Sequence, residues 1–277
     1  MKNKVGFHTN CKCDDTSFEE TLRNIKAAGF DHVMLDTNRS SLEDGISLAQ
    51  NLGLTVDFVH LPFRPSREFN LNAFWAFGKA NKMIIKSIID QIETCAKFGV
   101  PVVILHPSHE PHKHAHEIQS EKQGIKSFRK ILEATKATGV KIAIENLGLN
   151  DTKYMRLLLD NIKDDSLGFC YDCGHHYLSH DTKEVDFLTL YGDRVFAIHL
   201  HDNLMEGYDR DLHLLPFDGK IDFKKVMRDI AKSSYYGVVL LESKRQNKNQ
   251  PPADFLCEAK IRAEKLAEML DTAKTTL

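Results

Sequence analysis

The segment GVKIAIENL, residues 139–147, contains the repeating unit of this chain. Gly139 follows a helical pattern, residues 141–145 form a short apolar run, and Glu145 ends that run. A glycine just before a strand is the turn chemistry that connects a helix to the strand after it. The segment therefore predicts one step of an alternating β–α chain with parallel strands. The same glycine-before-strand order recurs at Gly29, Gly53 and Gly99.

Short apolar runs alternate with longer amphipathic stretches along all 277 residues. The predicted strands are 4–8, 32–36, 55–60, 101–106, 141–145, 167–172, 195–201 and 238–242. The predicted helices are 17–28, 42–52, 79–98, 117–138, 152–161, 183–191, 223–233 and 254–272. Eight β–α units without a linker between them predict a (β/α)₈ TIM barrel that forms one domain over residues 1–277. The alternative is an open doubly wound sheet, but GFHTNCKC at residues 6–13 is no glycine-rich phosphate loop.

The composition excludes several classes of protein. The chain has 37 Lys and Arg against 39 Asp and Glu, a net charge of −2, which disfavours a nucleic-acid partner and provides no basic face for an anionic membrane. We expect no membrane partner. No run reaches the roughly 18 apolar residues of a membrane span. MKNKVGFHTN at residues 1–10 lacks the apolar core of a signal peptide. Six scattered cysteines then indicate reduced thiols and a cytoplasmic location.

Residues of metal-ligand type stand at the ends of six predicted strands. They are His60, His106, Glu145, Asp172 with His175, His201, and Glu242. In a closed barrel the carboxyl ends of the strands form one ring, so these side chains would converge. Each alone is more often a hydrogen-bonded core histidine or an ion-pair partner. Together, buried carboxylates and imidazoles need a compensating cation, and they are ligands of divalent metals. The coincidence predicts a metal site.

Three other histidine-rich or cysteine-containing motifs differ in how strongly they support a metal site. HLHDNLMEGYDRDLHLLPFDGKIDF, residues 199–223, holds three histidines and five aspartates directly after a predicted strand, which favours the metal site. The Cys170-x-x-Cys173 and Cys11-x-Cys13 pairs have no matching second pair, so we interpret them as packing and loop residues. HPSHEPHKHAHE, residues 106–117, is interpreted beyond its first histidine as a solvated loop over the site.

Taken together, these motifs resemble the xylose-isomerase-like TIM barrels, the superfamily of sugar isomerases and epimerases that also includes endonuclease IV. The resemblance covers essentially the whole chain. It rests on HLP at 60–62, HPS at 106–108, ENL at 145–147, DCGH at 172–175, HLHDN at 199–203, DLHLLPFDGKIDF at 211–223 and LES at 241–243.

The resemblance implies a set of site residues. In the sugar-processing branch, one divalent metal (Mn, Zn, Co or Mg) is held by residues that correspond to Glu145, Asp172, His201 and Glu242, with the two glutamates also catalytic. The residues expected to contact substrate are His175, His60, His106, Asp211, His213 and Trp75, although Trp75 also fits a core position. In endonuclease IV three zinc ions use nine ligands, and the corresponding positions here all carry ligand-type residues: His60, His106, Glu145, Asp172, His175, His201, Asp211, His213 and Glu242.

The pattern of residues 211–223 and the scarcity of clustered basic residues favour the sugar branch. We therefore expect a metal-dependent isomerase or epimerase that moves a proton on a small carbohydrate through a stabilised enediolate. The substrate class includes free sugars, sugar phosphates and inososes. The alternatives are a zinc phosphodiesterase on abasic DNA and a metal-binding or sugar-binding protein without catalysis. A homo-oligomer is compatible with the sequence.

Overall fold

The computed structural model describes residues 4–13, 15–37, 41–62, 64–109, 114–147, 152–178, 186–204 and 211–276. Its eight parallel strands are hydrogen-bonded in the order β7-β6-β5-β4-β3-β2-β1-β8. A parallel bridge between Leu200, just after β7, and Leu241 of β8 closes the ring. The strands are β1 (Val5–His8), β2 (His32–Asp36), β3 (Thr55–His60), β4 (Val102–Leu105), β5 (Lys141–Glu145), β6 (Leu167–Asp172), β7 (Val195–His199) and β8 (Val239–Leu241). The predicted (β/α)₈ TIM barrel is confirmed.

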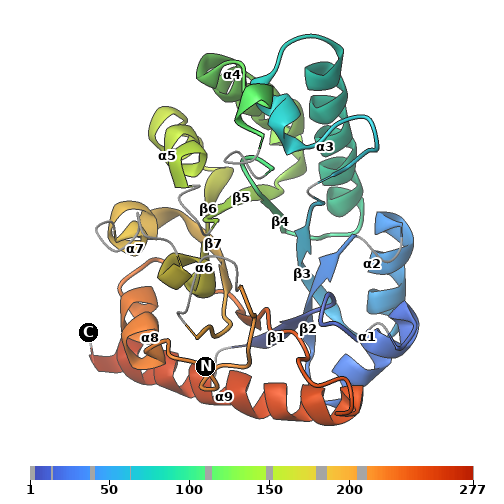
Figure 1. Ribbon diagram of the computed structural model, residues 1–277, viewed down its shortest axis with the longest axis vertical. Helices are drawn as coiled ribbons and strands as arrows, with labels where there is room; N and C mark the ends of the chain where they lie inside the picture. The colour runs from blue at the N-terminus through green and yellow to red at the C-terminus, as the bar shows by residue number, and fades with distance from the viewer. Residues whose placement is uncertain are drawn as a thin grey trace.

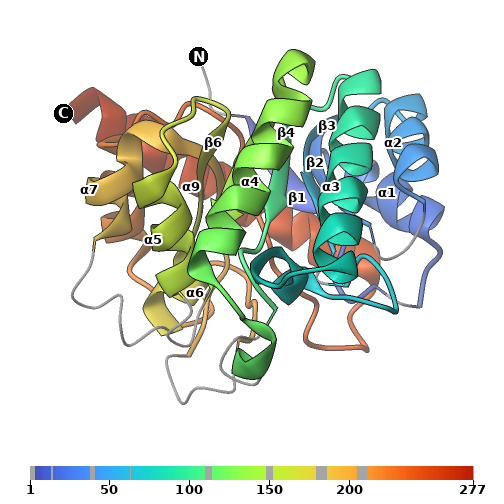
Figure 2. The same cartoon turned by 90° about the horizontal axis from the view of Figure 1, so that it is seen from above.

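The helices form the outer layer, and Figure 1 shows them around the central strands. They are α1 (Phe18–Ala27), α2 (Leu42–Asn51), α3 (Lys79–Lys97), α4 (Glu121–Thr135), α5 (Thr152–Asn161), α6 (Cys173–Leu178), α7 (Phe187–Tyr191), α8 (Phe223–Ala231) and α9 (Pro252–Thr276). Figure 2 shows α5, α4, α3 and α2 side by side in front of the strands. The last helix, α9, packs against both α8 and α1, which completes the ring. No described helix combines the length and the apolar character needed to cross a bilayer.

Short 3₁₀ helices supplement these elements: η1 (Leu71–Trp75), η2 (Ala115–Glu117), η3 (Lys136–Thr138) and η5 (Gly192–Arg194). The predicted helix 117–138 is therefore observed as three pieces, η2, α4 and η3. Part of the predicted helix 183–191 lies outside the described residues.

Local sequence explains where helices begin and end. The Ser17 hydroxyl accepts a hydrogen bond from the Glu20 amide at 3.1 Å, and the Ser41 hydroxyl accepts one from the Asp44 amide at 3.2 Å. Both are N-caps that satisfy a free amide of the first turn. After η3, Gly139 adopts a left-handed conformation with a φ of 70°. Glycine enters this region without steric cost, so the chain can reverse into β5 as the opening segment predicts.

Side chains on each strand alternate between the barrel interior and the helices. In β5, Ile142 and Ile144 belong to the large cluster under the helices, whereas Ala143 belongs to a separate inner cluster. The inner cluster comprises Met34, Phe58, Val102, Ile104, Ala143, Cys170, Ala197, Val238 and Leu240. Because strand side chains repeat every two residues, the residue two positions beyond an inner one also points inward, one layer nearer the mouth.

Candidate metal centre

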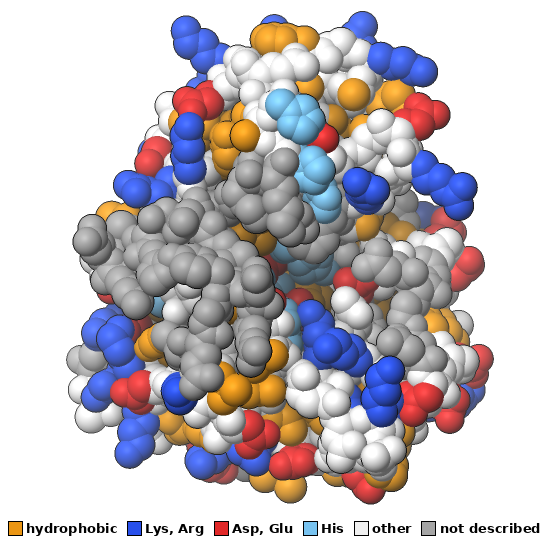
Figure 3. Space-filling view, in the orientation of Figure 1, with side chains coloured by type: hydrophobic (Ala, Val, Ile, Leu, Met, Phe, Trp, Pro, Cys, Tyr) orange, Lys and Arg blue, Asp and Glu red, His pale blue; other side chains and the backbone are white. Residues whose placement is uncertain are grey.

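Besides β2, where Asp36 follows Met34, six strands place a ligand-type residue two positions after an apolar residue of the inner cluster. The pairs are Phe58 and His60, Ile104 and His106, Ala143 and Glu145, Cys170 and Asp172, Ala197 and His199, and Leu240 and Glu242. The barrel interior therefore changes within one layer from apolar side chains to carboxylates and imidazoles. Figure 3 shows histidine and acidic side chains in the hollow at the centre of the face seen in Figure 1.

The central cluster consists of Glu145, Asp172, His199 and Glu242, whose ligand atoms all lie within 4.8 Å of one another. The Nδ1 atom of His199 is 3.2 Å from Oε1 of Glu145, 3.7 Å from Oδ2 of Asp172 and 3.1 Å from Oε2 of Glu242. One imidazole nitrogen thus faces three carboxylates that come from three other strands. This mixed oxygen and nitrogen set suits Mn²⁺, Co²⁺ or Zn²⁺.

The family resemblance assigns His201 to this cluster, but the structure places His199 there instead. Both side chains point into the barrel, because they are two residues apart in the chain. His201 lies about 6.6 Å further along, in the next layer toward the mouth. His199 follows the inward-facing Ala197 by two residues, whereas His201 follows it by four. Counting from the last inner apolar residue would have identified His199.

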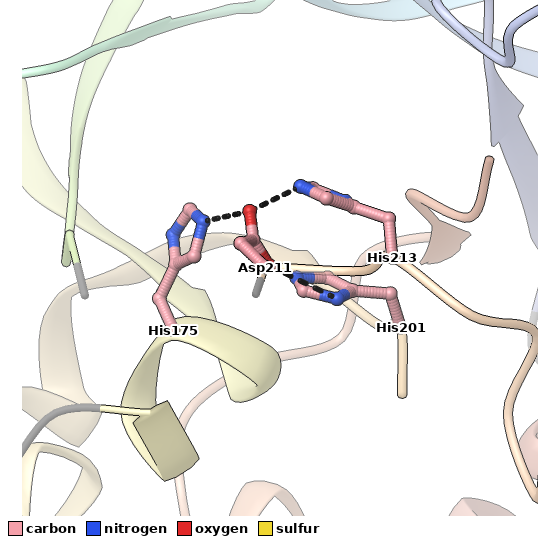
Figure 4. Close-up of side chains that lie close together, drawn as sticks. All are labelled: His175, His201, Asp211 and His213. Atoms are coloured by element: carbon pink, nitrogen blue, oxygen red, sulfur yellow. Dashed lines mark hydrogen bonds and ion pairs between the residues drawn. The ribbon is translucent and has the colours of Figure 1, made fainter. Parts of the chain in front are cut away.

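An outer cluster contains His175, His201, Asp211 and His213 (Figure 4). Oδ2 of Asp211 is 3.2 Å from Nε2 of His175 and 2.6 Å from Nε2 of His213. The rings of His201 and His213 stack with their centroids 3.9 Å apart. The structure therefore brings together four residues that are spread over three segments of the sequence.

A third cluster joins the central one from the other side. Oε2 of Glu145 is 3.0 Å from Nε2 of His60 and 2.8 Å from Nε2 of His106. Oε1 of the same carboxylate faces His199 in the central cluster. Asp172 connects the central and outer clusters in the same way, because its Oδ1 is 3.0 Å from Nε2 of His201. Two shared carboxylates thus link three clusters.

The DCGH segment has a steric requirement for its glycine. Asp172 ends β6, and its Oδ1 accepts a hydrogen bond of 2.7 Å from the amide of His175, which caps the first turn of α6. Between them, a Cβ on Gly174 would lie 2.0 Å from Cε1 of His201. Only glycine lets α6 pass so close to that ring, so this segment fixes the position of the outer cluster against β6.

The ENL segment fixes two strand ends relative to each other. The side-chain amide of Asn146 donates to the carbonyl of Asp172, and the amide of Asp172 donates to Oδ1 of Asn146, both at 2.8 Å. This pair of hydrogen bonds joins the ends of β5 and β6, where Glu145 and Asp172 arise. It holds the two shared carboxylates at a constant separation.

Asp202 organises the segment that carries the outer cluster. Its Oδ1 accepts hydrogen bonds from the amides of Asn203 and Ile221, and its Oδ2 accepts from the amides of Phe217 and Gly219, at 2.8–3.0 Å. The carboxylate is completely buried. The sequence reasoning did not single out Asp202. The sequence feature that could have identified Asp202 is an aspartate just after a strand, followed later in the same segment by a turn with a glycine, Gly219.

The electrostatics of the site favour ionised carboxylates. Burial raises the pKa of Glu145, but the charges of His199 and His106 more than offset it, so the pKa lies well below the usual value. Burial likewise raises the pKa of Glu242, and His199 and His213 reverse that shift. Burial lowers the pKa of His199, but nearby Cys170 and the carboxylates of Glu242 and Glu145 more than reverse this, so that the pKa lies well above the usual value.

These residues fit a divalent cation. Oε2 of Glu242 is buried and accepts no hydrogen bond from the described residues, although Nδ1 of His199 is 3.1 Å away. A buried carboxylate oxygen without a donor is costly unless a cation satisfies it. Three carboxylates and one imidazole that face a common point provide such a ligand set.

Trp75 belongs to the large apolar core cluster. Its side chain is completely buried, and its Nε1 donates to the carbonyl of Pro107 at 2.7 Å. A Cβ on Gly124 would lie 2.0 Å from the indole ring, so Trp75 packs tightly against α4. This is the core position, and the structure gives no support to the expected substrate contact.

His8, at the end of β1, is a further buried residue near the site that the sequence reasoning did not identify. Its Nε2 donates to the carbonyl of Ser243 at 2.8 Å, next to Glu242. Burial lowers the pKa of His8 to about 3. The unfolded chain binds a proton there below the ordinary value of 6.5, whereas the folded chain does not. His8 therefore destabilises the fold as the pH falls from 6.5 toward 3.

We expect His8→Gln to make the protein less sensitive to acid. The amide of glutamine can still donate to the Ser243 carbonyl, but it does not titrate. The difference between the pKa of His8 in the folded and unfolded chains lowers the free energy of unfolding of the wild type by about 2 kcal/mol at pH 5. Between pH 7 and pH 5, the variant should therefore lose about 2 kcal/mol less of its free energy of unfolding than the wild type. Urea unfolding of chelator-treated protein at both pH values measures this, with the exposed His116→Gln as control. Equal pH dependence of wild type and His8→Gln would contradict the assignment.

Comparisons with known proteins agree with this fold. The family model described as "Xylose isomerase-like TIM barrel" matches residues 22–271. An uncharacterised protein of Sinorhizobium fredii is 28% identical, over 94% of this chain and 92% of that protein. An inosose dehydratase of Lacticaseibacillus casei is 26% identical, over 41% of this chain and 42% of the enzyme.

Solved structures show the same architecture at lower identity. A D-tagatose 3-epimerase-like protein has a TM-score of 0.74 at 21% identity, over 98% of this chain and 99% of that chain. The IolI protein with a bound zinc atom has a TM-score of 0.70 at 19% identity, with the same coverage of both chains. The family match spans nearly the whole sequence, and the barrel it describes is the one observed. The chain belongs to the xylose isomerase-like TIM barrel family.

Proposed function

We propose that the protein is a divalent-metal-dependent sugar isomerase or epimerase. The observation that carries this proposal is the central cluster, in which Glu145, Asp172 and Glu242 lie within 3.7 Å of Nδ1 of His199. The names of family relatives and structural neighbours support it, because they refer to tagatose and ribulose epimerases and to inosose dehydratases. The cofactor we propose is a divalent ion, Mn²⁺, Zn²⁺, Co²⁺ or Mg²⁺. The partner is a small carbohydrate.

The two glutamates of the cluster are suited to proton transfer. Bound metal supplies a Lewis acid that stabilises negative charge on a substrate oxygen. Glu145 comes from β5 and Glu242 follows β8, with β6 and β7 between them on the shorter way around the barrel. They can therefore approach a substrate from different sides. One carboxylate takes the proton next to the carbonyl, and the other returns a proton to the opposite face in an epimerisation. In an isomerisation, one carboxylate moves the proton to the adjacent carbon.

Neighbouring histidines hold these groups in place. His60 and His106 both contact Oε2 of Glu145, which leaves its Oε1 toward the central cluster. Nδ1 of His175 donates to the carbonyl of Asn146 at 3.0 Å, and Nε2 of the same ring lies 3.2 Å from Oδ2 of Asp211. We assign His175, Asp211 and His213 to the binding of substrate hydroxyl groups at the mouth.

A solvent-exchange screen tests the proposal. Chelator-treated protein is reloaded with each of the four ions and incubated in deuterated water with a panel of ketoses and inososes. We expect deuterium at the carbon next to the carbonyl of at least one substrate, with exchange lost on chelation and recovered on reloading. Metal binding without exchange in any compound of the panel would contradict an isomerase or epimerase function.

The three linked clusters favour a second candidate function, hydrolysis of a phosphodiester. Sites with two or more ions stabilise both the attacking and the leaving oxygen of a phosphate. All nine positions that the resemblance relates to endonuclease IV ligands lie within these clusters, with His201 in the outer one. Elemental analysis separates the candidates. About three zinc ions per chain together with nicking of an abasic oligonucleotide would favour the phosphodiesterase.

A further inference from the structure

A separate group of metal-ligating side chains lies outside the barrel centre, on the loop that follows β4. It consists of His114, His116 and Glu117, whose ligand atoms lie within 4.8 Å of one another. Nδ1 of His114 is already 3.4 Å from Oε1 of Glu117. Two ligand atoms of one tetrahedral zinc ion are separated by about 3.4 Å, because each lies about 2.0–2.1 Å from the metal. The existing spacing matches that requirement.

Hydrogen bonds orient the carboxylate of this group. Oε2 of Glu117 accepts from the side-chain amides of Asn70 at 3.0 Å and Asn72 at 2.9 Å. Asn72 is almost completely buried, so its position is fixed by packing. The second oxygen, Oε1, is the one that faces His114. Outer partners of this kind are typical of metal-binding carboxylates.

The same asparagine connects this loop to η1. Asn72 accepts a hydrogen bond from the amide of His109 at 2.8 Å and donates to the carbonyl of His109 at 2.9 Å. The ring of His109 stacks on that of His114, with their centroids 5.7 Å apart. Glu117, Asn70 and Asn72 also line a surface cavity of about 380 Å³, together with Arg64 and Arg67.

We propose that His114, His116 and Glu117 form a rim site that binds one divalent transition-metal ion, separate from the barrel centre. Two imidazoles and one carboxylate favour Zn²⁺, Ni²⁺ or Cu²⁺ over Mg²⁺ and Ca²⁺. The ligands are partly exposed, so the ion exchanges more readily than one in the buried centre. Its carboxylate ligand, Glu117, is joined to η1 through Asn72. This site does not depend on the proposed function of the centre.

Immobilised metal tests the rim site selectively, because an ion fixed to a resin reaches surface ligands but not the buried clusters. Untagged full-length protein is applied to a Ni²⁺ resin and compared with a His114→Ala/His116→Ala variant. His112, outside the described residues, is left unchanged in both. We expect the wild type to require a higher imidazole concentration for elution. Equal elution of the two proteins would overturn the proposal.

A solution measurement gives the stoichiometry. Wild type and the double variant are dialysed against buffered Zn²⁺ and analysed for metal, with the exposed Lys122→Ala as a matched surface control. We expect the double variant to bind one zinc ion fewer than both other proteins. Equal zinc content in all three would overturn the rim site. Asp172→Asn should lose metal from the centre and keep the rim ion, so a failure of the proposed central site is distinguishable from a failure of this one.

Discussion

Replacing either Glu145 or Glu242 with glutamine is expected to lower solvent-deuterium incorporation by about 10²–10⁴-fold, the usual contribution of a positioned acid–base group. Glutamine keeps the size of the side chain but cannot accept the proton. Each carboxylate is also ionised in the folded protein, because nearby histidines lower its pKa below the usual value despite burial. The loss should appear in kcat at saturating substrate and metal, measured by mass spectrometry of the recovered sugar.

The control must separate proton transfer from metal binding. Metal content is measured on the same samples, and a defect that excess metal fully restores would assign the residue as a ligand only. Glu68→Gln removes an exposed carboxylate from the loop after β3 and should leave exchange unchanged. Unimpaired exchange in either Glu145→Gln or Glu242→Gln would reject the acid–base assignment for that residue.

The second large effect is expected at Asp202, and it concerns stability. Asp202→Ala removes the acceptor for four backbone amides, those of Asn203, Phe217, Gly219 and Ile221. A hydrogen bond to a charged group contributes about 1.5–3 kcal/mol, and these four are not additive. We therefore expect the free energy of unfolding to fall by at least about 3 kcal/mol.

The loss at Asp202 should extend to the outer cluster. The backbone of Asp202 pairs with Leu214, the neighbour of His213, through hydrogen bonds of 2.9 and 2.8 Å. Urea unfolding measures the change, with Asp218→Ala as an exposed control in the same segment. If Asp202→Ala does not fold, Asp202→Asn provides the measurement, since it replaces one acceptor oxygen with a donor. Wild-type stability of both Asp202 variants would show that the segment is held by other contacts.

Much of the fold is predictable because every β–α unit carries its own local signals. Each of the eight predicted strands is observed. β1 begins one residue later than predicted, β4 and β8 are one residue shorter at each end, and β7 ends two residues earlier. His106, His201 and Glu242 therefore lie just beyond hydrogen-bonded strands. Cys170 and Cys173 are both buried, Cys170 among apolar residues of the barrel interior, as predicted for packing residues.

The site is less predictable where a residue's role depends on the layer of the barrel interior that its side chain occupies. Periodicity places both His199 and His201 inside the barrel, but the layer each occupies depends on the register between strands. That register includes a shift between Phe169 and Cys170 where β6 meets β7. Trp75 illustrates a different difficulty, because an aromatic residue near the mouth is compatible with either a substrate wall or a core. The packing of α4 against its ring favours the core.

The sharing of carboxylates between clusters has an evolutionary consequence. Glu145 and Asp172 each serve two clusters, so losing either would impair two binding positions in a single substitution. His60, His106 and His213 each serve one, and a descendant lacking them would keep the central position intact. The number of ions held by such a barrel can thus change gradually from its edges. Substitutions at these histidines can in this way alter the surroundings of the central ligand set while that set itself stays unchanged.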